Sequence, residues 1–375
     1  ITDIEYEPYS IYTADYTYPE EVWTDILQND STDALGLMPI QLNNGNFITS
    51  IYNHVVCYDV SSGERIWTKN YGSITDFSRI VLENELLLVG SNKVYNVNGE
   101  TGELNWVTNL MGKVNRISFQ SGELYTGVGY GSNSFDTDSS AVVRINLETG
   151  EWEQLLGISN DTFIANLQAP TVYIDEIGDT ILLTHNRSGS QEPPYSSSLD
   201  FYAYNITQNN LLWSLKDFDD EGLSNAWNPP IVKEGKVYFT TSRTVYCFDA
   251  KNGNILWEKR YDHSNFLRSN YQILGDKLLL NTQEEFLALD INTGNEIWRN
   301  GDTNSTLLTT ISNGRVYATN GKYLSILDVE TGETLYKLRP PIAGGGFHTT
   351  VAVDEERKLM FTVDFYTARC MKLPE

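Results

Sequence analysis

The stretch "LDINTGNEIW", Leu289 to Trp298, decides the fold, because versions of it recur along the chain. It consists of an apolar run that ends in Asp290, a Thr-Gly pair, and a second run that carries a tryptophan. An Asp side chain bonds the backbone of its own turn, and glycine accepts positive φ, so the stretch predicts a tight hairpin between two β-strands. The other copies read YDVSSGERIW, NVNGETGELNW, INLETGEWEQ, YNITQNNLLW, FDAKNGNILW and LDVETGETLY.

The repeat has a period of about 40 residues, which is typical of β-propeller blades. The glycine slot falls at positions 63, 102, 150, 209, 253, 294 and 332, so successive spacings are 39, 48, 59, 44, 41 and 38 residues. Asn209 is the one departure from glycine, and asparagine is the next most tolerant residue of positive φ.

A second repeat, a strand–turn–strand unit, lies upstream of each hairpin and occurs eight times, from "MPIQLNNGNFITS" to "TTVAVDEERKLMFTV". The hairpins are one fewer, but "EEVWTDI" around Trp23 is similar to "GERIWTKN" around Trp67. We therefore expect an all-β fold, with residues 1–375 forming one eight-bladed β-propeller of four-stranded antiparallel blades. Residues 20–26 are expected to be the outer strand that closes the last blade, which removes an exposed sheet edge, and residues 1–19 an extended tail. Seven blades is the alternative if "EEVW" is not a blade strand.

Charge and composition exclude several classes of function. Lys and Arg number 26 against 50 Asp and Glu, a formal net charge of −24, which disfavours nucleic acids and anionic lipid surfaces as partners. No apolar run of 18 residues is present, so no transmembrane helix is expected. The acidic balance and the many Asn, Ser, Thr and Tyr residues fit an exported protein, periplasmic or at the cell surface. We expect the protein to be a monomer. A lipid anchor on a segment preceding Ile1 is compatible with this location.

The three cysteines indicate neither a zinc site nor a disulfide framework. Cys57 and Cys247 occupy the same hairpin slot in blades four apart, on opposite sides of an eight-bladed ring. They cannot reach the Cα separation of about 6 Å that a disulfide requires, and are expected to be buried apolar residues.

No catalytic residue is predicted. The four histidines, at 54, 185, 263 and 348, lie outside any local hydrolase or metalloprotease motif. Asp217, Asp219 and Glu221 have the spacing of a calcium loop, but Asn228 stands where a bidentate glutamate is needed. A solvated acidic loop is the competing interpretation; no cofactor is expected, and calcium here is the alternative.

The long connections are expected on one face of the ring, where functional loops concentrate. They comprise residues 127–140, 184–200, 214–227, 258–269 and 337–348. The residues expected to contact a partner there are Tyr130, His185, Arg187, Tyr195, Trp227, Arg268 and His348.

Ala288, Asp290, Thr293, Gly294 and Trp298 resemble the tryptophan-docking motif of pyrroloquinoline-quinone-type propellers. In that superfamily the tryptophan of one blade stacks on the backbone of the next. The resemblance implies such a role for Trp23, Trp67, Trp106, Trp213, Trp257, Trp298 and Tyr336.

In size the chain is similar to the cofactor-free outer-membrane assembly lipoproteins of this superfamily rather than to its dehydrogenases. The adjacent Cys-Cys pair of the alcohol-oxidising branch and a haem-binding CxxCH are absent from the sequence. We therefore expect a non-catalytic scaffold that binds a protein or glycan through its loop-decorated face. The alternative is a quinone- or sugar-binding oxidoreductase that uses the central funnel.

Overall fold

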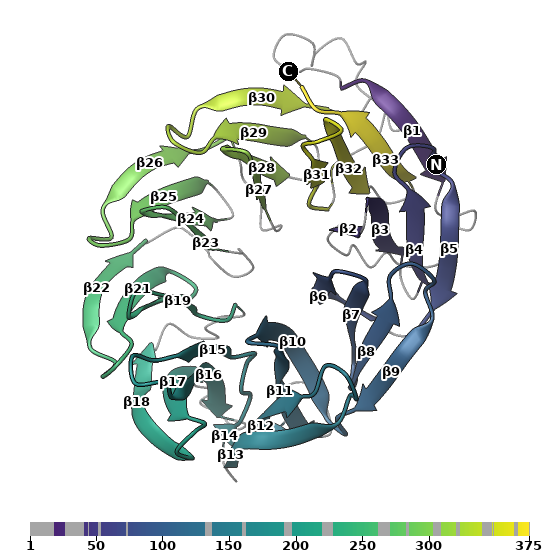
Figure 1. The fold of residues 1–375 in the computed structure, drawn as a ribbon. Helices are drawn as coiled ribbons and strands as arrows, with labels where there is room; N and C mark the ends of the chain where they lie inside the picture. The colour runs from purple at the N-terminus through teal and green to yellow at the C-terminus, as the bar shows by residue number, and fades with distance from the viewer. Residues whose placement is uncertain are drawn as a thin grey trace, which may run out of the picture.

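The computed structural model is an all-β ring of eight blades around a central axis, so the eight-bladed prediction is confirmed (Figure 1). It describes residues 19–26, 41–43, 45–51, 54–72, 74–131, 137–159, 163–190, 197–219, 228–261, 271–282, 285–302, 309–319, 323–339, 347, 349–363 and 367–374. Within these ranges every regular element is a β-strand.

Each blade is an antiparallel sheet, and in blades 1 to 7 the strands follow chain order from the axis outward. Blade 1 holds β2 (Gln41–Asn43), β3 (Asn46–Ile51), β4 (His54–Asp59) and β5 (Arg65–Asn70). Blade 2 holds β6 (Ile74–Leu82), β7 (Glu85–Gly90), β8 (Lys93–Asn98) and β9 (Leu104–Asn109). Blade 3 holds β10 (Lys113–Gln120), β11 (Glu123–Gly131), β12 (Thr137–Ile145) and β13 (Trp152–Ser159). In blade 4, β14 (Phe163–Ile164) and β15 (Thr171–Ile174) both pair with β16 (Thr180–Ser190), followed by β17 (Ser197–Asn205) and β18 (Asn210–Asp219).

The second half of the ring repeats this order. Blade 5 holds β19 (Ile231–Lys233), β20 (Lys236–Thr240), β21 (Thr244–Asp249) and β22 (Ile255–Arg260). Blade 6 holds β23 (Gln272–Leu274), β24 (Lys277–Asn281), β25 (Phe286–Asp290) and β26 (Glu296–Asn300). Blade 7 holds β27 (Thr310–Ser312), β28 (Arg315–Thr319), β29 (Leu324–Asp328) and β30 (Thr334–Leu338). Blade 8 holds β31 (Ala352–Asp354), β32 (Leu359–Val363), β33 (Thr367–Lys372) and, outermost, β1 (Glu21–Ile26).

Blade 8 is built from both ends of the chain, as expected from the "EEVW" stretch. β1 pairs antiparallel with β33, from Glu21 opposite Met371 to Ile26 opposite Thr367. Buried Arg369 forms an ion pair with Glu21 at 3.2 Å. This pairing covers the edge of β33 and closes the ring.

The core lies between the blades, because the middle strands of each blade are buried on both faces. β24, for example, has four consecutive buried residues, whereas only Trp298 is buried on the outermost strand β26. Each large apolar side chain buried this way contributes about 1.5 to 3 kcal/mol to stability. Cys57, Cys247 and Cys370 are free and buried, and burial raises the pKa of Cys247 to about 11 and of the other two to about 12. These thiols therefore stay protonated and belong to the core.

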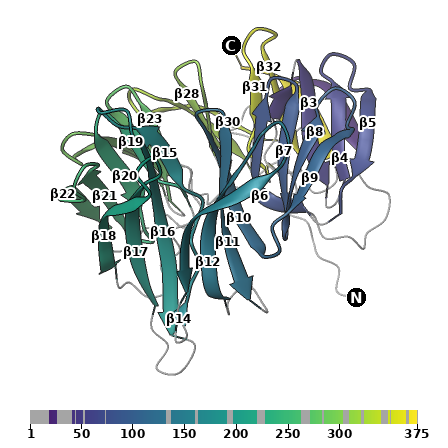
Figure 2. The same cartoon turned by 60° about the horizontal axis from the view of Figure 1, so that its bottom comes forward.

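Two segments expected to be long loops are largely strand. Residues 127–140 fall mostly in β11 and β12, and residues 184–200 mostly in β16 and β17. β11, β12 and β17 have 9 residues and β16 has 11, whereas the corresponding strands of the other blades have 5 or 6. The described residues of both insertions therefore lengthen two neighbouring hairpins, and one end of blade 4 extends beyond its neighbours (Figure 2).

Candidate functional site

Six tryptophans on outermost strands each bond to the next blade, and we call these bonds indole contacts. In each one the indole Nε1–H donates to a backbone carbonyl in a hairpin turn of that blade. The pairs are Trp23 to Val60 (2.9 Å), Trp67 to Gly99 (3.0 Å), Trp106 to Leu147 (2.7 Å), Trp213 to Ala250 (3.0 Å), Trp257 to Ile291 (3.0 Å) and Trp298 to Val329 (3.2 Å). Because one contact starts from Trp23 on β1, the closing strand is tied to blade 1 as well as to blade 8.

The turn glycine of the receiving blade lies directly against the indole ring. Gly332 has φ +73°, and a Cβ at this position would lie 2.4 Å from the ring of Trp298. Gly294 has φ +69°, and its Cβ would lie 2.6 Å from Trp257. Glycine is therefore required at these positions both by the backbone conformation and by the close approach of the indole.

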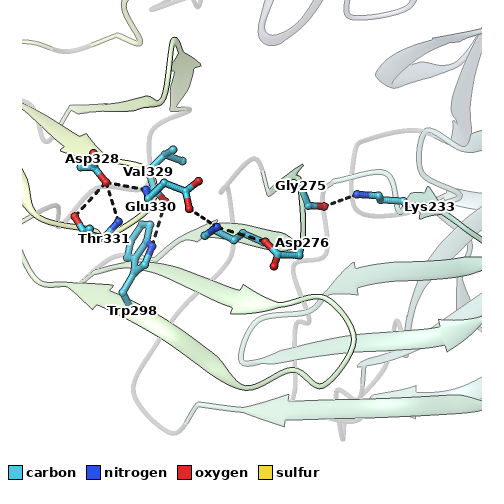
Figure 3. Close-up of polar contacts among 9 residues, drawn as sticks. Lys233, Gly275, Asp276, Trp298, Asp328, Val329, Glu330 and Thr331 are labelled. Atoms are coloured by element: carbon cyan, nitrogen blue, oxygen red, sulfur yellow. Dashed lines mark hydrogen bonds and ion pairs between the residues drawn. The ribbon is translucent and has the colours of Figure 1, made fainter.

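The aspartate of the hairpin shapes the turn that carries this glycine (Figure 3). Oδ1 of Asp328 accepts the backbone N–H of Glu330 at 2.9 Å and of Thr331 at 2.8 Å, and the Thr331 hydroxyl at 3.1 Å. These hydrogen bonds hold the pKa of Asp328 below its usual value. Oδ1 of this carboxylate is thus engaged within its own turn, the structural role expected of the hairpin aspartate.

Two of the eight junctions have no indole contact. Between blades 3 and 4, Gln154 stands in the tryptophan position, and Asn209, with φ +56°, stands in the glycine position. Between blades 7 and 8 the position holds Tyr336, whose ring lies 5.8 Å from the guanidinium carbon of Arg315. Both junctions have contacts nearer the axis.

Side chains on the innermost strands supply such contacts, here called inner contacts. Each donates to the carbonyl that immediately precedes the innermost strand of the next blade. They are Ser118 to Pro170 (2.5 Å), Thr171 to Pro230, Gln272 to Thr309 (3.3 Å) and Thr310 to Val351 (2.5 Å). Both junctions that lack an indole contact have an inner contact, from Ser118 and from Thr310.

Of the residues expected on the partner face, Tyr130 and Arg187 lie on the lengthened strands β11 and β16. Tyr130 is half-buried on β11, and burial raises the pKa of its hydroxyl. Arg187 lies on β16, and burial lowers the pKa of its guanidinium to about 10. Tyr195, Trp227, Arg268 and His348 lie outside the described residues.

The expectation that His185 faces a partner is wrong. His185 lies within β16, fully buried, with its ring 4.8 Å from that of Phe239 in blade 5. It shares a face of the strand with Leu183, which packs in the same cluster between blades 4 and 5.

The calcium candidate is only partly described. Asp217 and Asp219 end β18 rather than lying in a loop, and the backbone N–H of Asp217 donates to Asp200 at 3.1 Å. Glu221 lies outside the described residues. Among the residues that the structure places, no three His, Cys, Asp or Glu side chains gather as a metal site would require.

A cavity of about 360 Å³ lies against the innermost strands of blades 3, 4 and 5 and was missed from the sequence. Its wall includes Ser118, Gln120, Thr171, Tyr173, Asn228 and Tyr271. These residues come from strands far apart in the chain, so only the closed ring brings them together. The signal available in the sequence was the presence of polar residues on successive innermost strands.

Comparisons with known proteins agree with this architecture. The family model described as outer membrane protein assembly factor BamB matches residues 52–300 and 195–364. No curated protein sequence matches the chain. No helix in the described part of the chain is long and apolar enough to cross a membrane.

Solved structures share the fold at low sequence identity. BamB from Moraxella catarrhalis is 12% identical with a TM-score of 0.61, covering 95% of this chain and 100% of that one. Sqt1 from Saccharomyces cerevisiae is 13% identical with a TM-score of 0.64, covering 96% of this chain and 100% of that one. A europium-containing methanol dehydrogenase is 10% identical with a TM-score of 0.60, covering 90% of this chain and 84% of that one. Since proteins as different as BamB and a methanol dehydrogenase share the fold, the neighbours establish architecture alone. The match of the family model over most of the chain shows that the protein belongs to the BamB family of pyrroloquinoline-quinone-type β-propellers.

Proposed function

We propose that this protein is an exported, monomeric, non-catalytic scaffold that binds a protein partner through the face carrying the lengthened hairpins of blades 3 and 4. The observation that carries the proposal is the length of β11, β12, β16 and β17 compared with the corresponding strands of the other blades. Two neighbouring hairpins of this length form a raised wall on one sector of the ring. Segments that depart from a repeat are often the ones that carry function.

The ring supports a scaffold role because its blades are tied to one another. We infer that the six indole contacts are the tryptophan-docking contacts of this superfamily. A rigid support presents a binding surface without a loss of conformational entropy on binding. The turn carboxylates and buried thiols described above are engaged in structure, which also favours a binding function over catalysis.

A shortened blade 4 tests the proposal. Residues 187–199 are replaced by Ser-Arg, the link that joins Thr241 to Thr244 in blade 5. The control is Ile177→Ser, a substitution of a 79% exposed residue in the turn at the other end of β16. Each purified protein is immobilised and exposed to envelope extract of the producing cell, and captured proteins are identified by mass spectrometry.

We expect a partner captured by the unaltered protein and by Ile177→Ser to be lost with the shortened hairpin, while the melting temperature changes little. Unchanged capture by the shortened protein would exclude the wall as the binding surface. Pyrroloquinoline quinone with Ca²⁺ is added in a separate thermal-shift measurement. A large rise in melting temperature would favour the oxidoreductase alternative and overturn the scaffold proposal.

A further inference from the structure

Three hydroxyl groups on the wall of the cavity beside the axis already donate their hydrogens to backbone carbonyls. The hydroxyl of Ser118 donates to Pro170 at 2.5 Å, and that of Thr171 donates to Pro230. The Tyr271 hydroxyl donates to Pro229 at 2.7 Å. A hydroxyl has one hydrogen and two lone pairs, so each of these groups has used its hydrogen and remains an acceptor. A ligand in the cavity must therefore bring donors of its own.

Gln120 adds a polar group that no described part of the protein engages. It lies at the end of β10, half-buried on the cavity wall. Its side-chain amide makes no hydrogen bond to any described residue. An amide presents two N–H donors and one carbonyl acceptor, so a single ligand hydroxyl group can both donate to it and accept from it.

The remaining wall is apolar or uncharged. Tyr173 and Val172 of β15, with Pro229 and Pro230 before β19, offer carbon surface against which aliphatic C–H groups pack. None of the described residues that line the cavity is an Asp, Glu, Lys or Arg. Its volume of about 360 Å³ lies within the range of small-ligand pockets, about 300 to 1,000 Å³.

The positive charge of Arg116, near the wall formed by Asn228 and Tyr271, limits which ligands the cavity can bind. The Arg116 guanidinium donates to Oδ1 of Asn228. Burial raises the pKa of Tyr271 well above its usual value, and the charge of Arg116 acts in the opposite direction, so the guanidinium lies near this wall. A cationic ligand is disfavoured by Arg116, and a carboxylate by the lone pairs of the hydroxyl acceptors.

We propose that this cavity binds a neutral saccharide unit, which supplies several hydroxyl donors to the acceptor wall and packs its C–H face on Tyr173. This site is separate from the partner-binding wall of blades 3 and 4. The two proposals therefore stand or fall independently.

Ligand-observed NMR and calorimetry on the full chain test the assignment. The probes are glucose, N-acetylglucosamine and their β1,4-linked disaccharides, with galacturonate and glucosamine as charged comparators. We expect a neutral saccharide to bind more tightly than either charged sugar. Gln120→Leu is expected to weaken binding about tenfold, since it removes the amide's hydrogen bonds.

Gln154→Leu, the same substitution on an exposed outer strand, is the matched control and should leave the affinity unchanged. Tyr173→Phe keeps the ring and should bind within about twofold of the unaltered protein, whereas Tyr173→Ala should bind at least about tenfold more weakly. Absence of binding by every neutral saccharide would overturn the proposal, as would equal binding by the two leucine variants. Shortening the blade 4 hairpin should leave saccharide binding intact, which separates this site from the partner surface.

Discussion

The junction between blades 6 and 7 and the junction between blades 3 and 4 are held by different kinds of contact. At the first, the indole of Trp298 lies on Gly332 at the outer rim. At the second, Gln154 and Asn209 occupy the equivalent positions. A Cβ under an indole would lie 2.4 to 2.8 Å from the ring, so asparagine is tolerated only where the preceding blade supplies no tryptophan. The two positions are therefore coupled across each junction.

The contacts between blades 3 and 4 lie nearer the axis instead. The Asn115 amide donates to the Leu167 carbonyl at 2.8 Å, and Ser118 donates to Pro170. Gly127 of β11 approaches the Leu167 carbonyl so closely that a Cβ would lie 1.9 Å from its oxygen. Polar contacts and one glycine on the inner side thus replace the indole at the rim.

Removing an indole should have the largest effect on stability. Trp298→Ala deletes a buried ring and its hydrogen bond, and we expect a loss of about 4 kcal/mol in the free energy of unfolding. Gln154→Ala, at the corresponding exposed position, should change it by less than about 0.5 kcal/mol. Urea denaturation followed by tryptophan-independent circular dichroism measures both. Similar losses in the two variants would refute the distinction between the junctions.

Adding a methyl group beneath the indole should have the next largest effect. Gly332→Ala places a Cβ 2.4 Å from the Trp298 ring at φ +73°, so we expect a loss of about 3 kcal/mol from strain and overpacking together. Gly314→Ala in the same blade has the same φ with nothing within 4 Å, and should lose about 1 kcal/mol from strain alone. If both lose the same amount, the indole does not constrain the glycine.

The coupling itself is measurable by converting the exceptional junction. Gln154→Trp alone should destabilise by about 1 kcal/mol, because the ring meets the Cβ of Asn209. Combined with Asn209→Gly, it should recover stability, with a coupling energy of about 1 to 2 kcal/mol in a double-mutant cycle. Additive effects of the two substitutions would show that these positions are independent.

Removing the inner contact between blades 3 and 4 should have a moderate effect on the free energy of unfolding. Ser118→Ala leaves the buried Pro170 carbonyl without its donor, and we expect a loss of about 1 to 2 kcal/mol. Thr310→Val removes the equivalent contact between blades 7 and 8 and should lose a similar amount. Unfolding midpoints that do not move would exclude a stabilising role for these hydroxyls.

The smallest effect concerns the turn carboxylate and its dependence on pH. Hydrogen bonds hold the pKa of folded Asp328 below the 3.8 usual for an aspartate, so the stability that its carboxylate contributes is complete well above pH 3.8 and is lost as pH falls through the lower folded value. Asp328→Asn should therefore cost about 0.5 kcal/mol at neutral pH, because water screens this exposed turn, and less near pH 2. A difference between the two proteins that grows on acidification would contradict this sign.

Much of the architecture was accessible from the sequence because each blade repeats its own turn chemistry. The Asp-x-x-Thr-Gly turn and the tryptophan four residues after its glycine act locally, so they fixed the blade count and the role of β1. The lengthened hairpins were misread as loops, since Gly, Ser and Asn indicate turns locally, whereas pairing between Arg187 and Leu199 depends on the partner strand.

The candidate sites were less accessible because they depend on neighbouring blades. His185 was expected at the surface because it lies near a segment interpreted as a loop. It lies instead within β16, on the face of the strand that packs against blade 5. The cavity wall combines Gln120, Tyr173 and Asn228, which are brought together by the geometry of the whole ring. The polar residues on successive innermost strands were the one signal in the local sequence, and they do not show that these side chains meet.

The pairing of β1 with β33 sets an order on the folding of a chain made from its amino end. Glu21 is synthesised about 350 residues before its neighbour Met371, so β1 has no partner strand in blade 8 while the intervening blades form. The entropic cost of bringing β1 and β33 together grows only slowly with the length of chain between them. The larger consequence is the time that β1 spends unpaired before β33 has been made. The ring is therefore completed only after nearly the entire chain has been released, and until then the unpaired β1 strand leaves the protein open to misassembly.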